Sequence, residues 1–163
     1  MIELLTDKAA IDRAGADAIT ALTEAATAAT FYGARLSEEQ IAANKRIVTI
    51  SAATCAAAAT NANQHLAAAF VDGRFAGYVI ATRHDSSGHE LDWLMVHPDF
   101  HGSPVSSTLM QAGMDWLGHD KPMWLNVIAF NARAIRFYEK FGFAIDPTAE
   151  SQQVVPHRIM RRA

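Results

Sequence analysis

The fold is decided first at residues 91–110, which read LDWLMVHPDFHGSPVSSTLM. The apolar run LDWLMV predicts a strand, the turn HPDF ends it, and the loop HGSPVSS leads into a segment with helical periodicity. The apolar stripe of that helix comprises Val105, Leu109, Ala112 and Trp116. This stretch therefore predicts a strand, a loop and a helix in immediate succession.

The loop before this helix is a candidate anion site. Backbone N–H groups in the first turn of a helix have no intrahelical acceptor, and the helix dipole places positive charge there. Ser103 suits the N-cap position and Pro104 the first helical position, so the helix should begin here. We expect this loop to accept a phosphate group without basic side chains.

A second strand, loop and helix follow at residues 125–143, which read LNVIAFNARAIRFYEKFGF. We expect a strand over residues 122–129 and a helix over residues 131–141, where Gly142 stops it. Short apolar runs predict the last strands at residues 143–145 and 157–160.

The N-terminal half combines helices with a hairpin. Residues 2–5 predict a strand, and one helix is expected from Asp7, with an apolar stripe of Ile11, Ala14, Ala18, Leu22 and Ala25. Ser37 and Gln40 form a capping-box pattern that starts a second helix, and the Ala-rich residues 52–63 favour helix as well.

The segments LAAAFV and FAGYVIAT flank the dipeptide Asp72-Gly73, which predicts a tight hairpin. A further turn at residues 86–88 leads to the strand over residues 90–96. Hairpin strands come first and strand–helix alternation later, so the sequence predicts an α/β fold with a mixed sheet flanked by helices.

Composition narrows the class of protein. The 163 residues suit one domain spanning residues 1–163, and the net charge of −3 disfavours a nucleic acid or an anionic membrane as partner. Cys55 is the single cysteine, which favours a reducing compartment. No apolar run approaches the roughly 20 residues that span a bilayer, and the first residues lack the pattern of a secretory signal. We expect a cytoplasmic protein.

The two decisive stretches together resemble the GNAT superfamily of N-acetyltransferases. Residues 96–110, VHPDFHGSPVSSTLM, are similar to its acetyl-CoA signature, in which a strand ending in V-x-P precedes a Gly-rich loop. Residues 125–143 are similar to its later motif of strand, Asn, helix, Tyr and Gly-Phe. The resemblance covers about the last two-thirds of the chain and implies the GNAT acyl-CoA N-acyltransferase fold, with a splayed sheet.

The resemblance also implies how acetyl-CoA, the co-substrate, is bound. Its pantetheine arm would pair with the strand at Leu94, Met95 and Val96, and Asn131 would contact the same arm. Its pyrophosphate would rest on the loop, for which the candidate residues are His101, Gly102, Ser103, Val105, Ser106 and Ser107.

The loop departs from the family pattern at three positions. His101 replaces Gln or Arg, and Pro104 and Ser106 replace the two small residues of the motif. Pro104 has no N–H, so one phosphate donor is missing. The serine hydroxyls can donate to phosphate instead, and a protonated His101 would supply positive charge.

Three residues are candidates for the chemistry. In the family the tyrosine at Tyr138 protonates the departing thiolate, which suits a positioned phenol; the alternative is a helix aromatic that only packs in the core. Glu90 and Asp92 are candidate general bases, two apart on one strand and so expected on the same face, or else simply solvated edge charges. Asn126 stands where some relatives carry a glutamate base, and an amide cannot take that role.

The leading hypothesis is transfer of an acetyl group from acetyl-CoA to a primary amine within a ternary complex. The acceptor is a small-molecule amine or a protein amine, and a homodimer follows family habit. One alternative is a non-catalytic GNAT-fold module that binds acyl-CoA or a protein. A metal-dependent hydrolase would rest on His97 and His101, which lack a third ligand, so we expect no metal.

Overall fold

The structure, a computed structural model, describes residues 1–31, 35–85 and 88–163. In this part of the chain one seven-stranded sheet has the order β1-β2-β3-β4-β5-β7-β6. The strands are β1 (Ile2–Thr6), β2 (Gln64–Val71), β3 (Arg74–His84), β4 (Gly88–Val96), β5 (Met123–Ile128), β6 (Ala144–Ile145) and β7 (His157–Arg162). Among the described strands, β4 and β5 pair in parallel and all other neighbours are antiparallel. The predicted α/β fold with a mixed sheet is confirmed.

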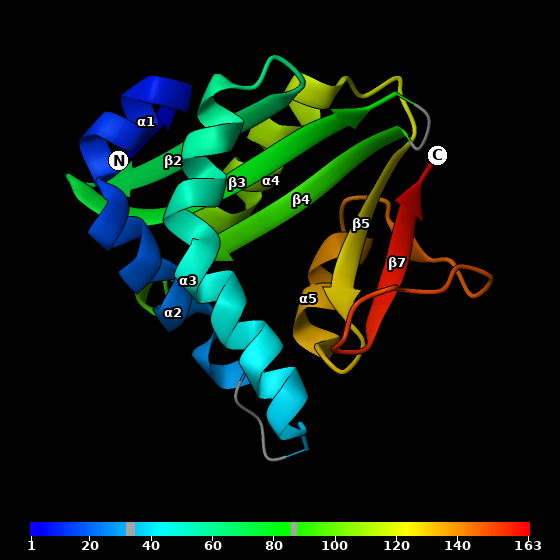
Figure 1. The fold of residues 1–163 in the computed structure, drawn as a ribbon. Coiled ribbons are helices and arrows are strands. Elements are labelled where there is room, and N and C mark those ends of the chain that lie inside the picture. Colours follow the sequence, from blue (N-terminus) through cyan, green and yellow to red (C-terminus); the bar gives the residue numbers. More distant parts are fainter. Residues whose placement is uncertain (32–34, 86–87) are drawn as a thin grey trace.

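Helices cover both faces of this sheet (Figure 1). On one face lie α1 (Asp7–Ala14), α2 (Ala16–Phe31) and α3 (Glu38–Thr60), whose buried residues share a core with Leu66 and Tyr78. On the other face α4 (Val105–Leu117) packs with Val79 and Leu91, and α5 (Ala132–Glu139) lies against the same core. The sheet is therefore the middle layer, with an apolar cluster on each side.

The N-terminal region contains a break that the sequence reading missed. The single helix predicted from Asp7 is wrong, because Gly15 adopts a φ of 82° and separates α1 from α2. A positive φ costs glycine little and interrupts the helical backbone. The capping box is confirmed: Ser37 Oγ accepts from the Gln40 N–H at 3.1 Å, and Gln40 Oε1 accepts from the Ser37 N–H at 3.0 Å. From there α3 runs unbroken through most of the Ala-rich segment to Thr60.

The predicted β2–β3 hairpin is confirmed at Asp72 and Gly73, which have φ values of 50° and 84°. Two positive φ values in succession are typical of the tight turn that matches the twist of paired strands. In the turn expected at residues 86–88, residues 86 and 87 lie outside the described residues; β4 begins at Gly88, two residues earlier than predicted.

The stripe expected on α4 is only partly right. Val105 and Leu109 are buried, but the buried face continues through Met110, Gly113, Met114 and Leu117. Trp116 instead lies at the edge of the core, where its ring stacks on His65 and lies beneath the Arg83 guanidinium. An indole at this edge keeps an apolar body packed while charged groups cover it.

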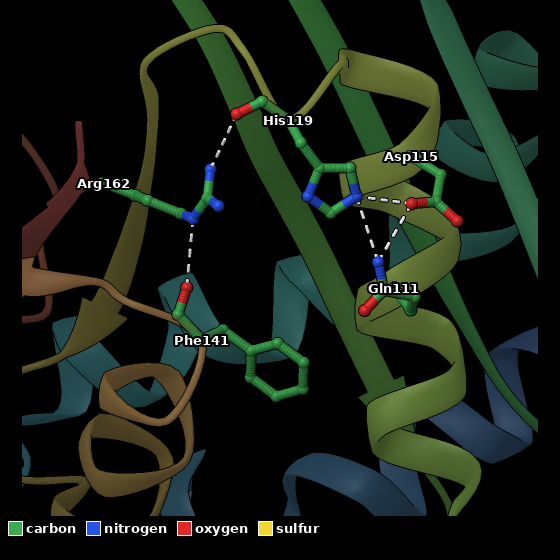
Figure 2. Close-up of polar contacts among 5 residues, drawn as sticks. All are labelled: Gln111, Asp115, His119, Phe141 and Arg162. Carbon is green, nitrogen blue, oxygen red and sulfur yellow. Dashed lines mark hydrogen bonds and ion pairs between the residues drawn. The ribbon is translucent and has the colours of Figure 1, made fainter.

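The C-terminal strand is tied to the loops around it by Arg162. Its Nε donates to the Phe141 carbonyl at 3.2 Å, and its Nη1 donates to the His119 carbonyl at 3.3 Å (Figure 2). Nearby, the His119 ring contacts Asp115 and Gln111 on the last turns of α4. Gly142, with a φ of 89°, ends the turn after α5, as predicted.

No helix in the described ranges 1–31, 35–85 and 88–163 is long and apolar enough to cross a membrane.

Candidate active site at the split between two parallel strands

The central feature of the site is a split in the sheet. β4 and β5 pair only at His89 with Met123 and at Glu90 with Trp124. Beyond these pairs the two strands diverge, as Figure 1 shows. From Leu91 to Val96, β4 pairs with β3 alone among the described strands, which leaves one edge of its backbone open. Such an edge offers N–H and C=O groups to an extended ligand.

A bulge in β4 lies next to the split. Ile80 pairs with Trp93 and Ala81 with Leu91, so Asp92 is the extra residue. Leu91 belongs to the core under α4, whereas Trp93 packs on the opposite core. We predicted that Glu90 and Asp92 share a face because side chains alternate regularly along a strand. That reason is wrong, because the bulge interrupts the alternation between them.

Glu90 and Asp92 nevertheless approach each other and form a side-chain hydrogen bond. Glu90 is only 8% exposed, so the alternative of solvated edge charges does not hold for it. Burial, followed by the charge and hydrogen bond of Glu90, raises the pKa of Asp92 from 3.8 to about 7. A carboxyl with such a pKa can take up and release protons at neutral pH, as a general base must.

A histidine and a tryptophan border these carboxyls. His84 Nε2 lies 2.8 Å from Glu90 Oε1, and the His84 ring stacks on Trp124 with ring centroids 5.8 Å apart. The indole Nε1 of Trp124 is buried and has no hydrogen-bond partner in the part of the chain that the structure describes. Asn126 lies two residues further along β5 and is half-buried.

The loop after β4 leads into α4 with a geometry close to the expected one. α4 begins at Val105, and Pro104 occupies the N-cap position that was predicted for Ser103. Ser103 still acts at the helix start, since its Oγ accepts from the Val105 N–H at 3.3 Å and donates to the Phe100 carbonyl. Gly102 has a φ of 79°, a conformation that glycine adopts readily.

Two donors remain free at this helix start. The backbone N–H groups of Ser106 and Ser107 have no acceptor among the described residues, as expected for the first turn of a helix. The hydroxyl of Ser107 donates to the Pro104 carbonyl at 3.1 Å, so this side chain is already engaged. The anion-accepting groups of the loop are therefore mainly backbone amides.

The positive charge beside this loop comes from a residue that the sequence reading missed. Arg133, on the first turn of α5, places Nη1 3.1 Å from His101 Nδ1. Burial and then the Arg133 charge lower the pKa of His101, so His101 is neutral at pH 7. The positive charge that a protonated His101 would have supplied comes instead from Arg133; Arg74 also lies beside the loop, but it pairs with Asp99. The sequence could have indicated this residue, because Arg133 lies within the later family motif.

Tyr138 and Asn131 lie at the two ends of α5. Asn131 caps the helix, its Oδ1 accepting from the Ala134 N–H at 3.2 Å, and this leaves the amide NH₂ to donate elsewhere. Tyr138 packs on Phe137 and Phe143, and dense apolar packing raises the pKa of its phenol to about 12. The ring is only half-buried, and its hydroxyl has no hydrogen-bond partner within the described residues. The phenol is thus protonated at neutral pH and free to donate.

Cys55 is excluded as a nucleophile by its environment. The thiol is completely buried in the core under α3, and this burial raises its pKa to about 12. A thiol with that pKa is protonated at neutral pH and unreactive. Among the described residues no group of three histidine, cysteine or acidic side chains is placed to hold a metal ion.

Comparisons with known proteins identify the relatives of this chain. The family model described as "Acetyltransferase (GNAT) family" matches residues 30–143. An uncharacterized N-acetyltransferase of Mycobacterium bovis is 35% identical over 103 residues, which cover 61% of this chain and 65% of that protein. The chain thus covers less than two thirds of that relative.

A mycothiol acetyltransferase of Acidimicrobium ferrooxidans is 37% identical over 81 residues, which cover 46% of this chain and 26% of that protein. Among solved structures, the PaiA N-acetyltransferase of Thermoplasma acidophilum in complex with coenzyme A superposes with a TM-score of 0.78. That match covers 99% of this chain and 98% of the other at 18% identity, and it shows a shared fold.

Proposed function

Because the chain belongs to the GNAT acetyltransferase family, we propose that it transfers an acetyl group from acetyl-CoA to a primary amine in a ternary complex. The observation that carries this proposal is the split between β4 and β5. A carboxyl with a pKa near 7, a free phenol and an anion-accepting loop surround that split.

Acetyl-CoA would lie along the open edge of β4, its pantetheine amides pairing with the backbone at Leu94, Met95 and Val96. Its pyrophosphate would accept from the amides of Ser106 and Ser107, and Arg133 would supply the charge that the loop lacks. The free amide NH₂ of Asn131 is available for the same arm.

The reaction begins with an ammonium group, which Asp92 deprotonates with the help of Glu90. The nitrogen lone pair attacks the thioester carbon, forming the C–N bond, while backbone N–H groups of β4 stabilise the oxyanion. The tetrahedral intermediate then loses a second proton from nitrogen to water, and its C–S bond breaks. The sulfur leaves with a proton from Tyr138, whose phenol regains one from the solvent.

Binding of acetyl-CoA tests this proposal before an acceptor is known. Calorimetry should show micromolar affinity that depends on the pyrophosphate arm. Arg133→Gln should weaken binding roughly tenfold or more, since a charge-assisted hydrogen bond contributes about 1.5–3 kcal/mol. Arg13→Gln is the matched control, because Arg13 lies on α1 and pairs with Glu3 of the edge strand β1. Equal affinities of wild type and Arg133→Gln would remove Arg133 from the site.

A second function, a non-catalytic acyl-CoA-binding or interaction module, is favoured by two specific residues. Pro104 withholds one donor from the loop, and Asn126 cannot serve as a base. Thiol release from acetyl-CoA, measured across polyamines, amino acids, aminoglycosides and peptide N-termini, separates the two functions. Tight binding without turnover on any amine would favour the module. The cytoplasmic location and the homodimer remain predictions.

A further inference from the structure

We propose that His84 is the proton outlet of this site, passing the proton that Asp92 and Glu90 collect from the acceptor amine to the solvent. This inference rests on the proposed acetyl transfer. It assigns a role to a residue that lies outside both family motifs, at the end of β3.

The reaction itself requires an outlet. An ammonium acceptor loses two protons when it becomes an amide, and the departing sulfur takes up only one of them. One proton per turnover must therefore leave the split in the sheet. Asp92 is half-buried, and Glu90 exposes only 10% of its side chain, so both have limited contact with bulk water.

The three side chains form a continuous polar path. Asp92 hydrogen-bonds to Glu90, and Glu90 Oε1 lies 2.8 Å from His84 Nε2. The His84 side chain is 36% exposed, so the path begins at the bulge in β4 and ends at the surface. Stacking on Trp124 holds the imidazole in this orientation. An imidazole can accept a proton on one ring nitrogen and release one from the other, which suits it to pass a proton to water.

The neighbouring arginines are engaged with other groups and do not pair with this path. Arg83 precedes His84 in the sequence, but its guanidinium is engaged elsewhere. It donates to the Trp116 carbonyl and lies over the Trp116 ring. On the β5 side, Trp124 pairs with Arg161 of β7, and Arg161 is engaged with Asp146. Among the described residues, Glu90 contacts the His84 ring, and the charge of His84 also acts on Asp92.

Two variants separate a relay from simple packing. His84→Gln keeps a hydrogen-bonding side chain but can neither carry charge nor relay a proton. His84→Arg keeps the positive charge and the hydrogen bond without titrating. His119→Gln is the matched control, since His119 is also part-exposed and also contacts a carboxylate, Asp115, far along α4 (Figure 2).

The first readout is the pKa of Asp92, measured by carbon NMR on protein with labelled aspartate and assigned with Asp92→Asn. The charge of His84 lowers the pKa of Asp92 in the wild type. His84→Gln should therefore raise this pKa, while His84→Arg and His119→Gln should not. An unchanged pKa in His84→Gln overturns the proposal.

The second readout is turnover with an amine found in the acceptor screen. In His84→Gln the acidic limb of kcat/KM should move to higher pH by the same amount, and added imidazole should restore part of the lost kcat. If His84 has only a structural role, imidazole will not restore kcat. That result would overturn the role of His84 as proton outlet and leave the proposed acetyl transfer standing. Absence of turnover in the wild type on every amine overturns the proposed function instead.

Discussion

At the level of single residues, chemical roles depend on how the fold changes ordinary side chains. Tyr138 and Asp92 illustrate this, because burial raises the pKa of both groups but suits one to donate a proton and the other to accept one. Desolvation raises the pKa of the Tyr138 phenol to about 12, and desolvation together with Glu90 raises the pKa of Asp92 to about 7, which makes Asp92 a base near neutrality. Neither shift can be calculated from sequence, because each depends on neighbours contributed by distant segments.

The role of Tyr138 predicts a specific kinetic defect. Tyr138→Phe should lower kcat by about 10²- to 10⁴-fold, the usual contribution of a positioned acid, and leave acetyl-CoA affinity nearly unchanged. Steady-state kinetics with the amine from the screen and calorimetry with acetyl-CoA measure the two effects. A kcat equal to that of the wild type would mean that the ring only packs against Phe137 and Phe143.

At the level of elements, the close packing of β3, β4 and α4 fixes the open edge of β4. Gly77 on β3 lies where an added Cβ would be 2.6 Å from the Met95 carbonyl oxygen and 3.0 Å from Leu109 Cδ1. The first of these atoms belongs to the backbone of β4. A side chain at position 77 would therefore displace the strand that is proposed to bind pantetheine.

Gly77→Ala should lower the free energy of unfolding by about 1–3 kcal/mol, the usual cost of overpacking, as measured by urea denaturation. Gly113→Ala is the matched comparison, because its Cβ would be 2.6 Å from Leu91 Cδ2, the far end of a flexible side chain. It also gains helix propensity within α4. We expect a smaller loss for Gly113→Ala, and equal losses would contradict this account.

Element boundaries also show how far local sequence reasoning reaches. The capping box at Ser37 and the hairpin at Asp72 were predictable, because each is a contact between residues close in sequence. The break at Gly15 was missed, since the apolar stripe of α1 and α2 continues across it. The bulge at Asp92 was also missed, because its register depends on pairing with β3.

At the level of the whole molecule, a raised pKa links the site to folding stability. The ordinary pKa of an aspartate is 3.8, whereas that of Asp92 in the folded protein is about 7, so between these values the folded state binds a proton that the unfolded state has lost. Stability from this group is therefore fully present below about pH 4 and falls as pH rises towards 7, by at most about 1.4 kcal/mol per pH unit.

The comparison of wild type with Asp92→Asn measures this effect. Asparagine does not titrate, so the difference in unfolding free energy between the two proteins should shift in favour of Asp92→Asn as pH rises from 4 to 7. Urea denaturation at several pH values gives this difference directly, and titrating groups that do not act on Asp92 cancel in it. A difference independent of pH would mean that Asp92 keeps an ordinary pKa.

The amino-acid sequence was enough to predict the α/β fold, most helices and strands, the family resemblance and the candidates Tyr138, Glu90 and Asp92. These follow from patterns that are local along the chain, such as periodicity, caps, turns and motifs. The packed fold was needed to show that Arg133 lies beside His101 at the loop and that His84 adjoins Glu90. Both pairs join different elements, and their electrostatics depend on burial and distance, which exist only once the sheet and its helices have packed.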